Sequence, residues 1–184
     1  KYLKSTENYE KKPQLVSYPC IEDRLSLIGK SNFKNKIRHF EQNVSTITLI
    51  CSFVWFKGFN EFINLAESMS KNNYKFNLVL NGSKKDFYKT YKEEMLPDNL
   101  EVFFQLSDIS QVLKKTSILL SMTNRRGWIE TWGMTLIEAM SFGIPVIAPN
   151  IGGQLEFIED NKNGFLVDES DIEEYKEKIN LLFN

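Results

Sequence analysis

Cysteine and histidine are scarce in this 184-residue chain, which contains two cysteines and one histidine. Cys20 and Cys51 are too few for a disulfide framework and too far apart for a CxxC metal or redox motif, so they indicate two reduced thiols in a cytoplasmic protein. His39 alone cannot form a multi-histidine metal site, and it leaves a Ser-His-Asp triad difficult to build. These absences argue against disulfide-rich proteins, histidine-metal proteins and triad-based hydrolases.

An excess of charge and long apolar runs are also missing. Basic residues number 23 and acidic residues 24, a net charge of −1, so we expect no nucleic-acid partner. No apolar run approaches the ~20 residues of a membrane-spanning helix, so we expect no direct membrane insertion of this chain. No signal-peptide pattern stands at the start. Because the first residue is Lys1 rather than Met, we expect the chain to be part of a longer protein.

What the chain does have is apolar surface to bury, with 42% hydrophobic and 13% aromatic residues. Its length fits one domain of ordinary size. Residues 1–45 are rich in Lys, Asn and Ser, and we predict that they form a linker or border segment. Residues 46–184 have a regular pattern and are predicted to form the domain.

Short apolar runs alternate with helical periodicity along this domain. The runs predict strands over residues 47–54, 76–80, 100–104, 117–121, 145–148 and 165–167. The segments between and after them predict helices over 59–69, 86–96, 109–113, 131–142, 153–159 and 171–183. This alternation predicts an α/β domain with a Rossmann-like parallel sheet of about six strands and helices on both faces. Such sheets bind ligands at the carboxyl ends of their strands, near the switch in strand order.

The turn after the first predicted strand carries a positive charge but no glycine-rich fingerprint. Neither GxGxxG nor a P-loop is present, which disfavours a dehydrogenase or a nucleoside triphosphatase. The turn instead ends in Lys57-Gly58, at the start of a predicted helix. A lysine beside the free N–H groups of a helix N-terminus suits a phosphate or diphosphate. A solvated lysine in a short surface loop fits the same spacing.

Two glutamates, Glu130 and Glu138, stand eight residues apart around the start of a predicted helix near Thr131 or Trp132. A fully helical span would place them ~12 Å apart along its axis. That exceeds the roughly 5–9.5 Å of the carboxylate pairs in glycoside hydrolases. Carboxylates so placed could hold two ends of a hydroxyl-rich ligand. The alternative is a capped helix with two solvated glutamates.

Glycines and arginines near these glutamates are further candidates. Gly133 is expected in the first helical turn, where the N–H groups of Gly133, Met134 and Thr135 could face an anion or a sugar oxygen. Arg125 and Arg126 could meet a diphosphate or form a solvated basic pair. The pairs Asn81-Gly82 and Gly152-Gly153 suit either tight turns or a close approach of the backbone to a ligand.

Three ordered motifs together resemble glycosyltransferase family 4, a group of retaining enzymes of the GT-B fold. They are Glu130-Thr-Trp-Gly-Met-Thr-Leu-Ile-Glu138 with its continuation to Val146, then Gly152-Gly-Gln-Leu-Glu156, then Asn163-Gly-Phe-Leu-Val167. With Lys57-Gly58 and the order of elements, the resemblance covers about residues 46–183.

The resemblance implies that the chain is the C-terminal domain, which binds a nucleoside diphosphate sugar, and that an N-terminal acceptor domain is missing. Glu138 would bind the ribose hydroxyls, and Lys57 would neutralise the diphosphate. Glu130 would lie beside the donor sugar as the catalytic residue. The backbone from Gly133 to Thr135 would contact sugar and phosphate. Gly58, Asn81, Gly82, Gln105 and Arg126 complete the predicted donor site. No metal or cofactor is expected, since a lysine and a helix N-terminus can offset the leaving charge.

The chain departs from the family where an arginine usually ends the first strand. Cys51-Ser52-Phe53 stands there, and Arg125 or Arg126 is hypothesised to substitute. The implied enzyme transfers a sugar to an acceptor hydroxyl in surface polysaccharide or glycolipid synthesis. It would be cytoplasmic, or held at the inner membrane face through the missing domain, and this chain alone would be inactive. A non-catalytic nucleotide-sugar-binding module and a nucleotide-sugar epimerase of GT-B-like fold are the alternatives.

Overall fold

The computed structural model describes residue 21 and residues 23–31 and 45–183. Most of the predicted linker over 1–45 therefore lies outside the described residues. Within it, residues 23–31 form a helix. None of the helices among the described residues is long and apolar enough to cross a membrane.

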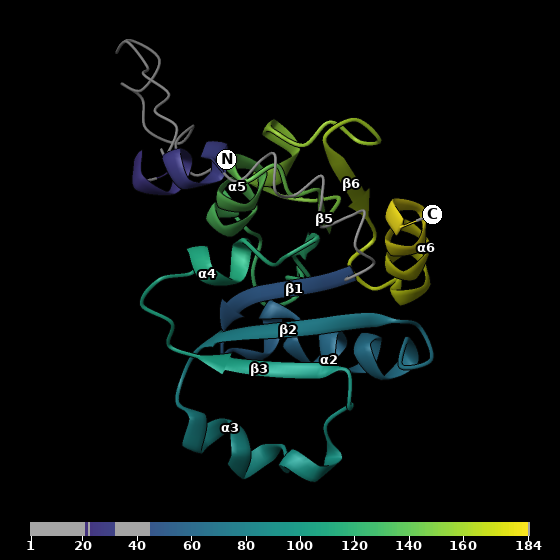
Figure 1. Ribbon diagram of the computed structural model, residues 1–184. Helices are drawn as coiled ribbons and strands as arrows, with labels where there is room; N and C mark the ends of the chain where they lie inside the picture. Colours follow the sequence, from purple (N-terminus) through teal and green to yellow (C-terminus); the bar gives the residue numbers. More distant parts are fainter. Residues whose placement is uncertain (1–20, 22, 32–44, 184) are drawn as a thin grey trace, which may run out of the picture.

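Six parallel strands form one sheet at the centre of the domain (Figure 1). The strands are β1 (Ser45–Ser52), β2 (Tyr74–Asn81), β3 (Leu100–Phe104), β4 (Ile118–Leu120), β5 (Val146–Pro149) and β6 (Gly164–Val167). Their order is β3-β2-β1-β4-β5-β6, and every pairing is parallel. The strand order therefore switches between β1 and β4, where chain connections lead away to opposite edges of the sheet. The predicted fold class is confirmed.

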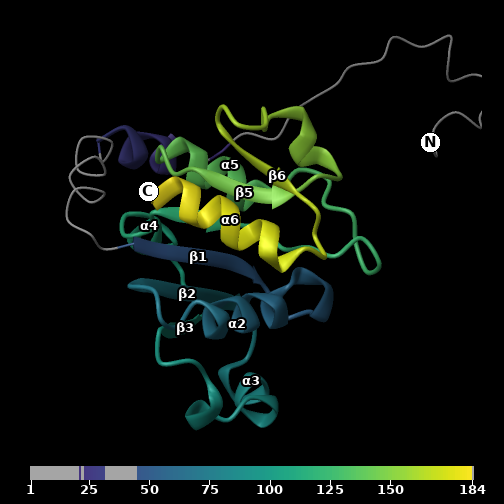
Figure 2. The same ribbon diagram turned by 90° about the vertical axis from the view of Figure 1, so that its right-hand side faces the viewer.

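Helices cover both faces of this sheet (Figure 2). The helices are α2 (Phe59–Ser68), α3 (Lys84–Thr90), α4 (Ser110–Leu113), α5 (Met134–Ser141) and α6 (Ile172–Phe183). One core cluster joins the sheet to α2, α3 and α6, with Phe62, Phe87 and Tyr175 fully buried. The other joins it to α4, α5 and the helix at 23–31, through Leu113 and Leu136 among others. Both faces are apolar because each strand side meets a helix.

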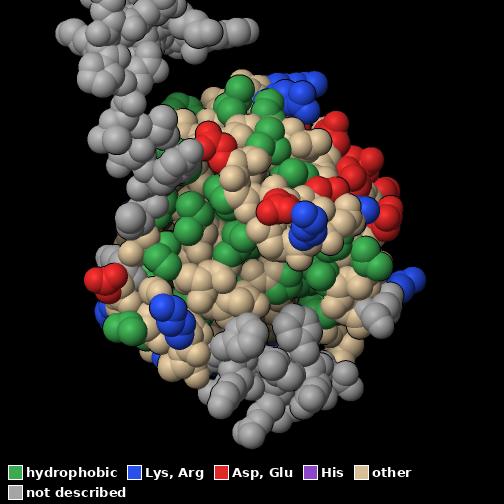
Figure 3. Space-filling model, turned by 90° about the horizontal axis from the view of Figure 1, so that it is seen from above, with side chains coloured by type: hydrophobic (Ala, Val, Ile, Leu, Met, Phe, Trp, Pro, Cys, Tyr) green, Lys and Arg blue, Asp and Glu red, His purple; other side chains and the backbone are tan. Residues whose placement is uncertain are grey.

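Helix α6 shows how the apolar period selects a buried face. Tyr175 and Ile179 are buried four residues apart, whereas Glu173 and Glu177, each two residues before one of them, are exposed. Figure 3 shows acidic side chains gathered on the side of the molecule where α6 lies in Figure 1. The amphipathic helix thus closes one face of the sheet and leaves its charges in solvent.

Three predicted helices have different bounds from those expected. The helix predicted over 86–96 divides into α3 and the 3₁₀ turn η3 (Glu93–Met95), because Tyr91 is extended and stacks its ring on Phe87. The helix predicted over 153–159 is only the 3₁₀ turn η4 (Gly153–Glu156). The helix predicted over 131–142 begins at Met134, because Gly133 has φ 57° and ψ 55° and cannot continue a right-handed helix. Gly133 is thus the N-cap of α5 and does not lie in its first turn.

Candidate functional site

A pocket of about 500 Å³ lies at the carboxyl ends of β1 and β4, where the strand order switches. Ser52 at the end of β1 and Ser121 just after β4 both line it. Open α/β sheets bind ligands at this point because the two connections leave in opposite directions and open a crevice. The position expected from the sequence is therefore where the structure has a cavity.

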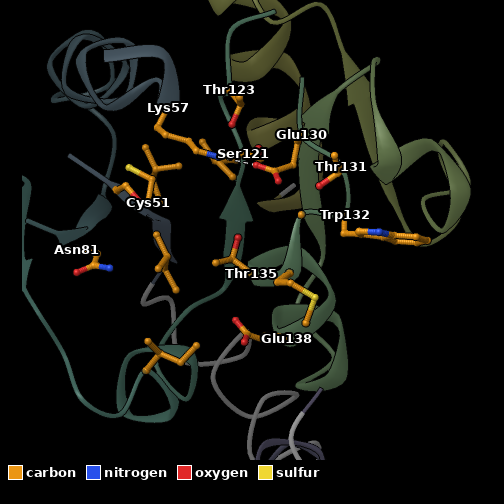
Figure 4. Close-up of a pocket in the computed structure, with 17 residues that line it drawn as sticks. Cys51, Lys57, Asn81, Ser121, Thr123, Glu130, Thr131, Trp132, Thr135 and Glu138 are labelled. Carbon is orange, nitrogen blue, oxygen red and sulfur yellow. Dashed lines mark hydrogen bonds and ion pairs between the residues drawn. The ribbon is translucent and has the colours of Figure 1, made fainter. Parts of the chain in front are cut away.

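Seven of the predicted site residues line this pocket (Figure 4). They are Lys57, Asn81, Glu130, Gly133, Met134, Thr135 and Glu138. They come from the turn after β1, from the end of β2, and from α5 with the loop that leads into it. In Figure 4 the side chains of Lys57 and Glu130 point toward each other, and Glu138 enters the pocket from the opposite end.

Lys57 and Glu130 form an ion pair inside the pocket. The Lys57 Nζ atom lies 2.6 Å from Glu130 Oε2, and the two side chains are 21% and 20% exposed. The two charges come from loops 73 residues apart. From the sequence, each of them was predicted separately as a site residue, but no local pattern indicated that the two side chains contact each other.

The turn that carries Lys57 is held by a glycine. Lys57 ends the 3₁₀ turn η2 (Trp55–Lys57), and Gly58 follows in the left-handed region with φ 79°. A Cβ atom on Gly58 would lie 2.1 Å from the carbonyl oxygen of Met122, just after β4. Gly58 does not line the pocket; it lets the backbone of the lysine turn approach the next segment closely.

A pair of glycines, Gly152 and Gly153, holds the loop that carries Glu130. The Gly153 N–H donates a 2.8 Å hydrogen bond to the Glu130 carbonyl oxygen. A Cβ atom on Gly153 would lie only 1.5 Å from the carbonyl oxygen of Thr131. Gly152, with φ 92°, is close to the Glu130 carbonyl as well. The sequence left open a tight turn or a close approach of this backbone to a ligand. In the structure the glycine backbone closely approaches the Glu130–Thr131 backbone.

Helix α5 supplies the other wall of the pocket. Gly133, Met134 and Thr135 line the pocket at its N-terminus, where the first N–H groups of a helix have no partner within the helix. This end of a helix carries a partial positive charge that favours anions. Glu138 lies one turn further along α5 and lines the same cavity. The partial positive charge at the N-terminus of α5 and the carboxylate of Glu138 thus lie one after the other along this wall of the pocket.

The two arginines considered as substitutes do not line the pocket. Arg125 Nη2 lies 2.7 Å from Glu169 Oε2, Arg125 Nε also contacts Glu169, and Asp168 is 4.0 Å away. The hydrogen bond to Arg125 holds the pKa of Glu169 below its ordinary value. Arg126 is exposed, and its backbone N–H bonds to Asn124. The structure therefore brings neither arginine to the cavity.

Gln105 and Gly82 lie beside the pocket, beyond Asn81. Gln105 follows β3 with φ 47° and donates its N–H to the Leu80 carbonyl oxygen at 3.0 Å. It lines an adjoining cavity of about 390 Å³ that shares Asn81 with the main pocket. A Cβ atom on Gly82 would lie 2.6 Å from the Cβ of Phe53, so this glycine serves a tightly packed turn.

Cys51 lines the pocket near the position at which the resemblance expects an arginine. Burial raises the pKa of its thiol to about 12, and the charge of Lys57 offsets only part of that effect. The thiol is therefore protonated at neutral pH and is not an activated nucleophile. Among the described residues, no group of three or more His, Cys, Asp and Glu side chains could hold a metal ion.

Residues 30–184 match the family described as Glycosyl transferases group 1. The chain belongs to this family. The poly(ribitol-phosphate) alpha-N-acetylglucosaminyltransferase of Staphylococcus aureus is 32% identical over 168 residues, which cover 89% of this chain and 33% of that protein. An uncharacterized glycosyltransferase of Haemophilus influenzae is 27% identical over 82% of this chain and 42% of its own length. The chain thus spans only about a third to two-fifths of these two relatives.

Solved structures of the family have the same architecture. The crystal structure of TarM matches with a TM-score of 0.65 and 30% identity, over 77% of this chain and 29% of that one. A C-terminal domain of a group 1 glycosyl transferase from Francisella tularensis matches with a TM-score of 0.63 and 20% identity, over 90% of this chain and 84% of that one. The second likeness concerns the fold alone. Together they agree with the GT-B type of Rossmann-like domain.

Proposed function

We propose that this chain is the donor-binding domain of a retaining glycosyltransferase of family 4, and that residues 46–184 hold a nucleoside diphosphate sugar. The observation that carries this proposal is the convergence of Lys57, the N-terminus of α5 and Glu138 on one pocket at the strand-order switch. A cation and a helix N-terminus suit a diphosphate, and a carboxylate suits paired hydroxyls. A nucleoside diphosphate sugar has both groups.

Each polar group then has a role in the transfer. Glu138 accepts hydrogen bonds from the ribose hydroxyls, while Lys57 and the first turn of α5 neutralise the diphosphate. The bond between the anomeric carbon and the phosphate oxygen breaks, and its electron pair leaves with the diphosphate. The acceptor hydroxyl oxygen bonds to the anomeric carbon on the same face, and its proton passes to the departing phosphate oxygen. Charge that develops on the departing phosphate is stabilised by the lysine and the helix end. Glu130 acts beside the donor sugar.

The relatives suggest uridine diphosphate N-acetylglucosamine as the first donor to test. The Staphylococcus aureus relative is by name an N-acetylglucosaminyltransferase, and a TarM structure 27% identical to this chain, with a TM-score of 0.62, contains UDP. We infer an acceptor domain in the part of the parent protein beyond this chain, since the chain spans a minority of its relatives. The parent enzyme would build a surface polymer in the cytoplasm, without a metal ion.

Calorimetry tests the proposal directly. We expect the chain to bind one of UDP-N-acetylglucosamine, GDP-mannose or ADP-glucose selectively, and Glu138→Ala to lose at least about tenfold in affinity, as expected for a lost hydrogen bond to a charged group. The matched control is Glu159→Ala, which removes an exposed carboxylate that pairs with Lys162 outside the pocket. A folded chain that binds none of the three donors would contradict the proposal.

A non-catalytic sugar-nucleotide-binding module is the second candidate. It is favoured by the absence of an arginine from the described pocket lining, where the family usually has one. The parent protein separates the two candidates. A transferase releases the free nucleoside diphosphate when an acceptor is present, whereas a binding module retains the intact donor.

A further inference from the structure

We propose that Glu130 makes this pocket discriminate between a nucleoside diphosphate sugar and the bare nucleoside diphosphate, because its carboxylate pairs with the ammonium group of Lys57 and repels the additional negative charge of the bare diphosphate. This inference rests on the proposed function and adds a specificity-determining role for one residue. It predicts that the pocket disfavours the product of transfer and favours the substrate.

The contact that carries the inference is the 2.6 Å ion pair between Lys57 Nζ and Glu130 Oε2. Both side chains are about four-fifths buried, at 21% and 20% exposure, unlike the exposed pairs on the surface. Solvent screens such a pair less than a surface pair. A phosphate that approaches Lys57 therefore meets a carboxylate already in contact with the same ammonium group.

The backbone segments that carry the two charges are held by close contacts and hydrogen bonds. The Gly153 N–H bonds to the Glu130 carbonyl at 2.8 Å, and the close approach of Gly153 to Thr131 fixes the loop from behind. The Lys57 turn is tied to the loop after β4 by the Asn124 N–H, which donates to the Phe56 carbonyl at 2.8 Å. The ion pair is therefore built into two connected loops (Figure 4).

The two ligands present opposite chemistry to this carboxylate. The terminal phosphate of a bare nucleoside diphosphate is joined only to the other phosphate and has a charge of about −1.5 to −2 at pH 7, which repels Glu130. In the sugar-bearing donor that phosphate is also esterified to the sugar and has a single charge, and the sugar has hydroxyl groups that can donate to a carboxylate. One side chain thus weakens the binding of the product and strengthens the binding of the substrate. Product release limits many enzymes, so this asymmetry would favour turnover.

Calorimetry on the chain with UDP and UDP-N-acetylglucosamine tests the inference. We expect Glu130→Gln to bind UDP about three- to tenfold more tightly and UDP-N-acetylglucosamine about tenfold more weakly, where tenfold corresponds to about 1.4 kcal/mol. The gain for UDP should shrink in the double variant with Lys57→Met, because no ammonium group is then freed to pair with the phosphate. Circular dichroism checks that each variant is folded.

Glu138→Gln is the matched control, since it removes the other carboxylate of the same pocket. In the proposed function this residue binds the ribose, which both ligands share, so the ratio of the two affinities should stay unchanged. If Glu130→Gln leaves UDP binding unchanged or weakens it, or if Glu138→Gln moves the ratio equally, the inference is wrong while the proposed function stands. If the unmodified chain binds neither these ligands nor the other donors, both are wrong.

Discussion

Gly153 approaches Thr131 so closely that a Cβ atom on the glycine would lie 1.5 Å from the threonine carbonyl oxygen. The same glycine donates its N–H to the Glu130 carbonyl at 2.8 Å. The turn after β5 thus supports the backbone of the segment that points a carboxylate at Lys57. A residue outside the pocket lining therefore determines where a charge of the pocket lies.

We expect Gly153→Ala to displace the Glu130–Thr131 segment. The new Cβ atom would meet the carbonyl oxygen and carbon of Thr131, and these backbone atoms cannot move without moving the chain. The free energy of unfolding should fall by about 1–3 kcal/mol, as for other overpacked sites. If the proposed function is correct, donor affinity should fall by at least about tenfold. Urea unfolding and calorimetry measure the two effects.

Gly164→Ala controls for lost stability alone. Gly164 lies in β6 and does not line the pocket. A Cβ atom on it would lie 2.8 Å from the side chain and from the carbonyl oxygen of Val146. This variant should lose stability and keep its donor affinity. Equal donor affinities in the two alanine variants would show that Gly153 has no positioning role.

The ion pair between Arg125 and Glu169 should make stability depend on pH. Arg125 holds the pKa of Glu169 below its ordinary value of 4.5, so the ionised carboxylate stabilises the folded state above pH 4.5. That contribution is lost as the pH falls through the lower, folded-state pKa. We therefore expect Arg125→Gln to lower the thermal midpoint at pH 7, with a difference from the unmodified chain that shrinks as the pH falls below 4.5.

Arg126→Gln is the matched control for this experiment. Arg126 is the neighbouring arginine and is exposed. Its substitution should leave the pH dependence of the thermal midpoint as it is in the unmodified chain. A destabilisation by Arg125→Gln that is the same at pH 3.5 and pH 7 would rule out the ion pair as its cause.

Tyr175 ties helix α6 to the end of β4. Its ring is fully buried, and its hydroxyl donates a 2.8 Å hydrogen bond to the carbonyl oxygen of Ser121, which lines the pocket. Tyr175→Phe should lower the free energy of unfolding by about 0.5–1.5 kcal/mol, because the partly buried hydrogen bond is lost. The control is Tyr74→Phe, whose side chain is less buried and whose hydroxyl makes a longer bond of 3.1 Å to Asn180, and which should cost less. An equal loss in urea unfolding would contradict this account.

The sheet and its ligand edge could be predicted because strand patterns are local. The apolar runs that contain Leu49, Leu78 and Leu119 are short, and each follows a polar residue. Continuous burial on both faces then leaves a parallel sheet as the arrangement that satisfies all of them. The segments after the strands could therefore be named as candidate site residues from the sequence.

The start of α5 could not be predicted, because the pattern that includes Trp132 and Leu136 continues the helical period upstream of the true boundary. A glycine at position 133 fits a costly helical position as well as a left-handed cap. The left-handed backbone of Gly133 and the contact of the Glu130–Thr131 segment with Gly153 exclude the helical alternative.

The sequence by itself determined the α/β class, the parallel sheet and the segments from which the pocket residues come, because these depend on composition and on periods of two to four residues. The tertiary structure decided which charges meet. Lys57 contacts Glu130 across 73 residues, and Arg125 contacts Glu169 across 44, away from the pocket. Such contacts depend on how the loops pack once the strands are ordered, and no local pattern records that packing.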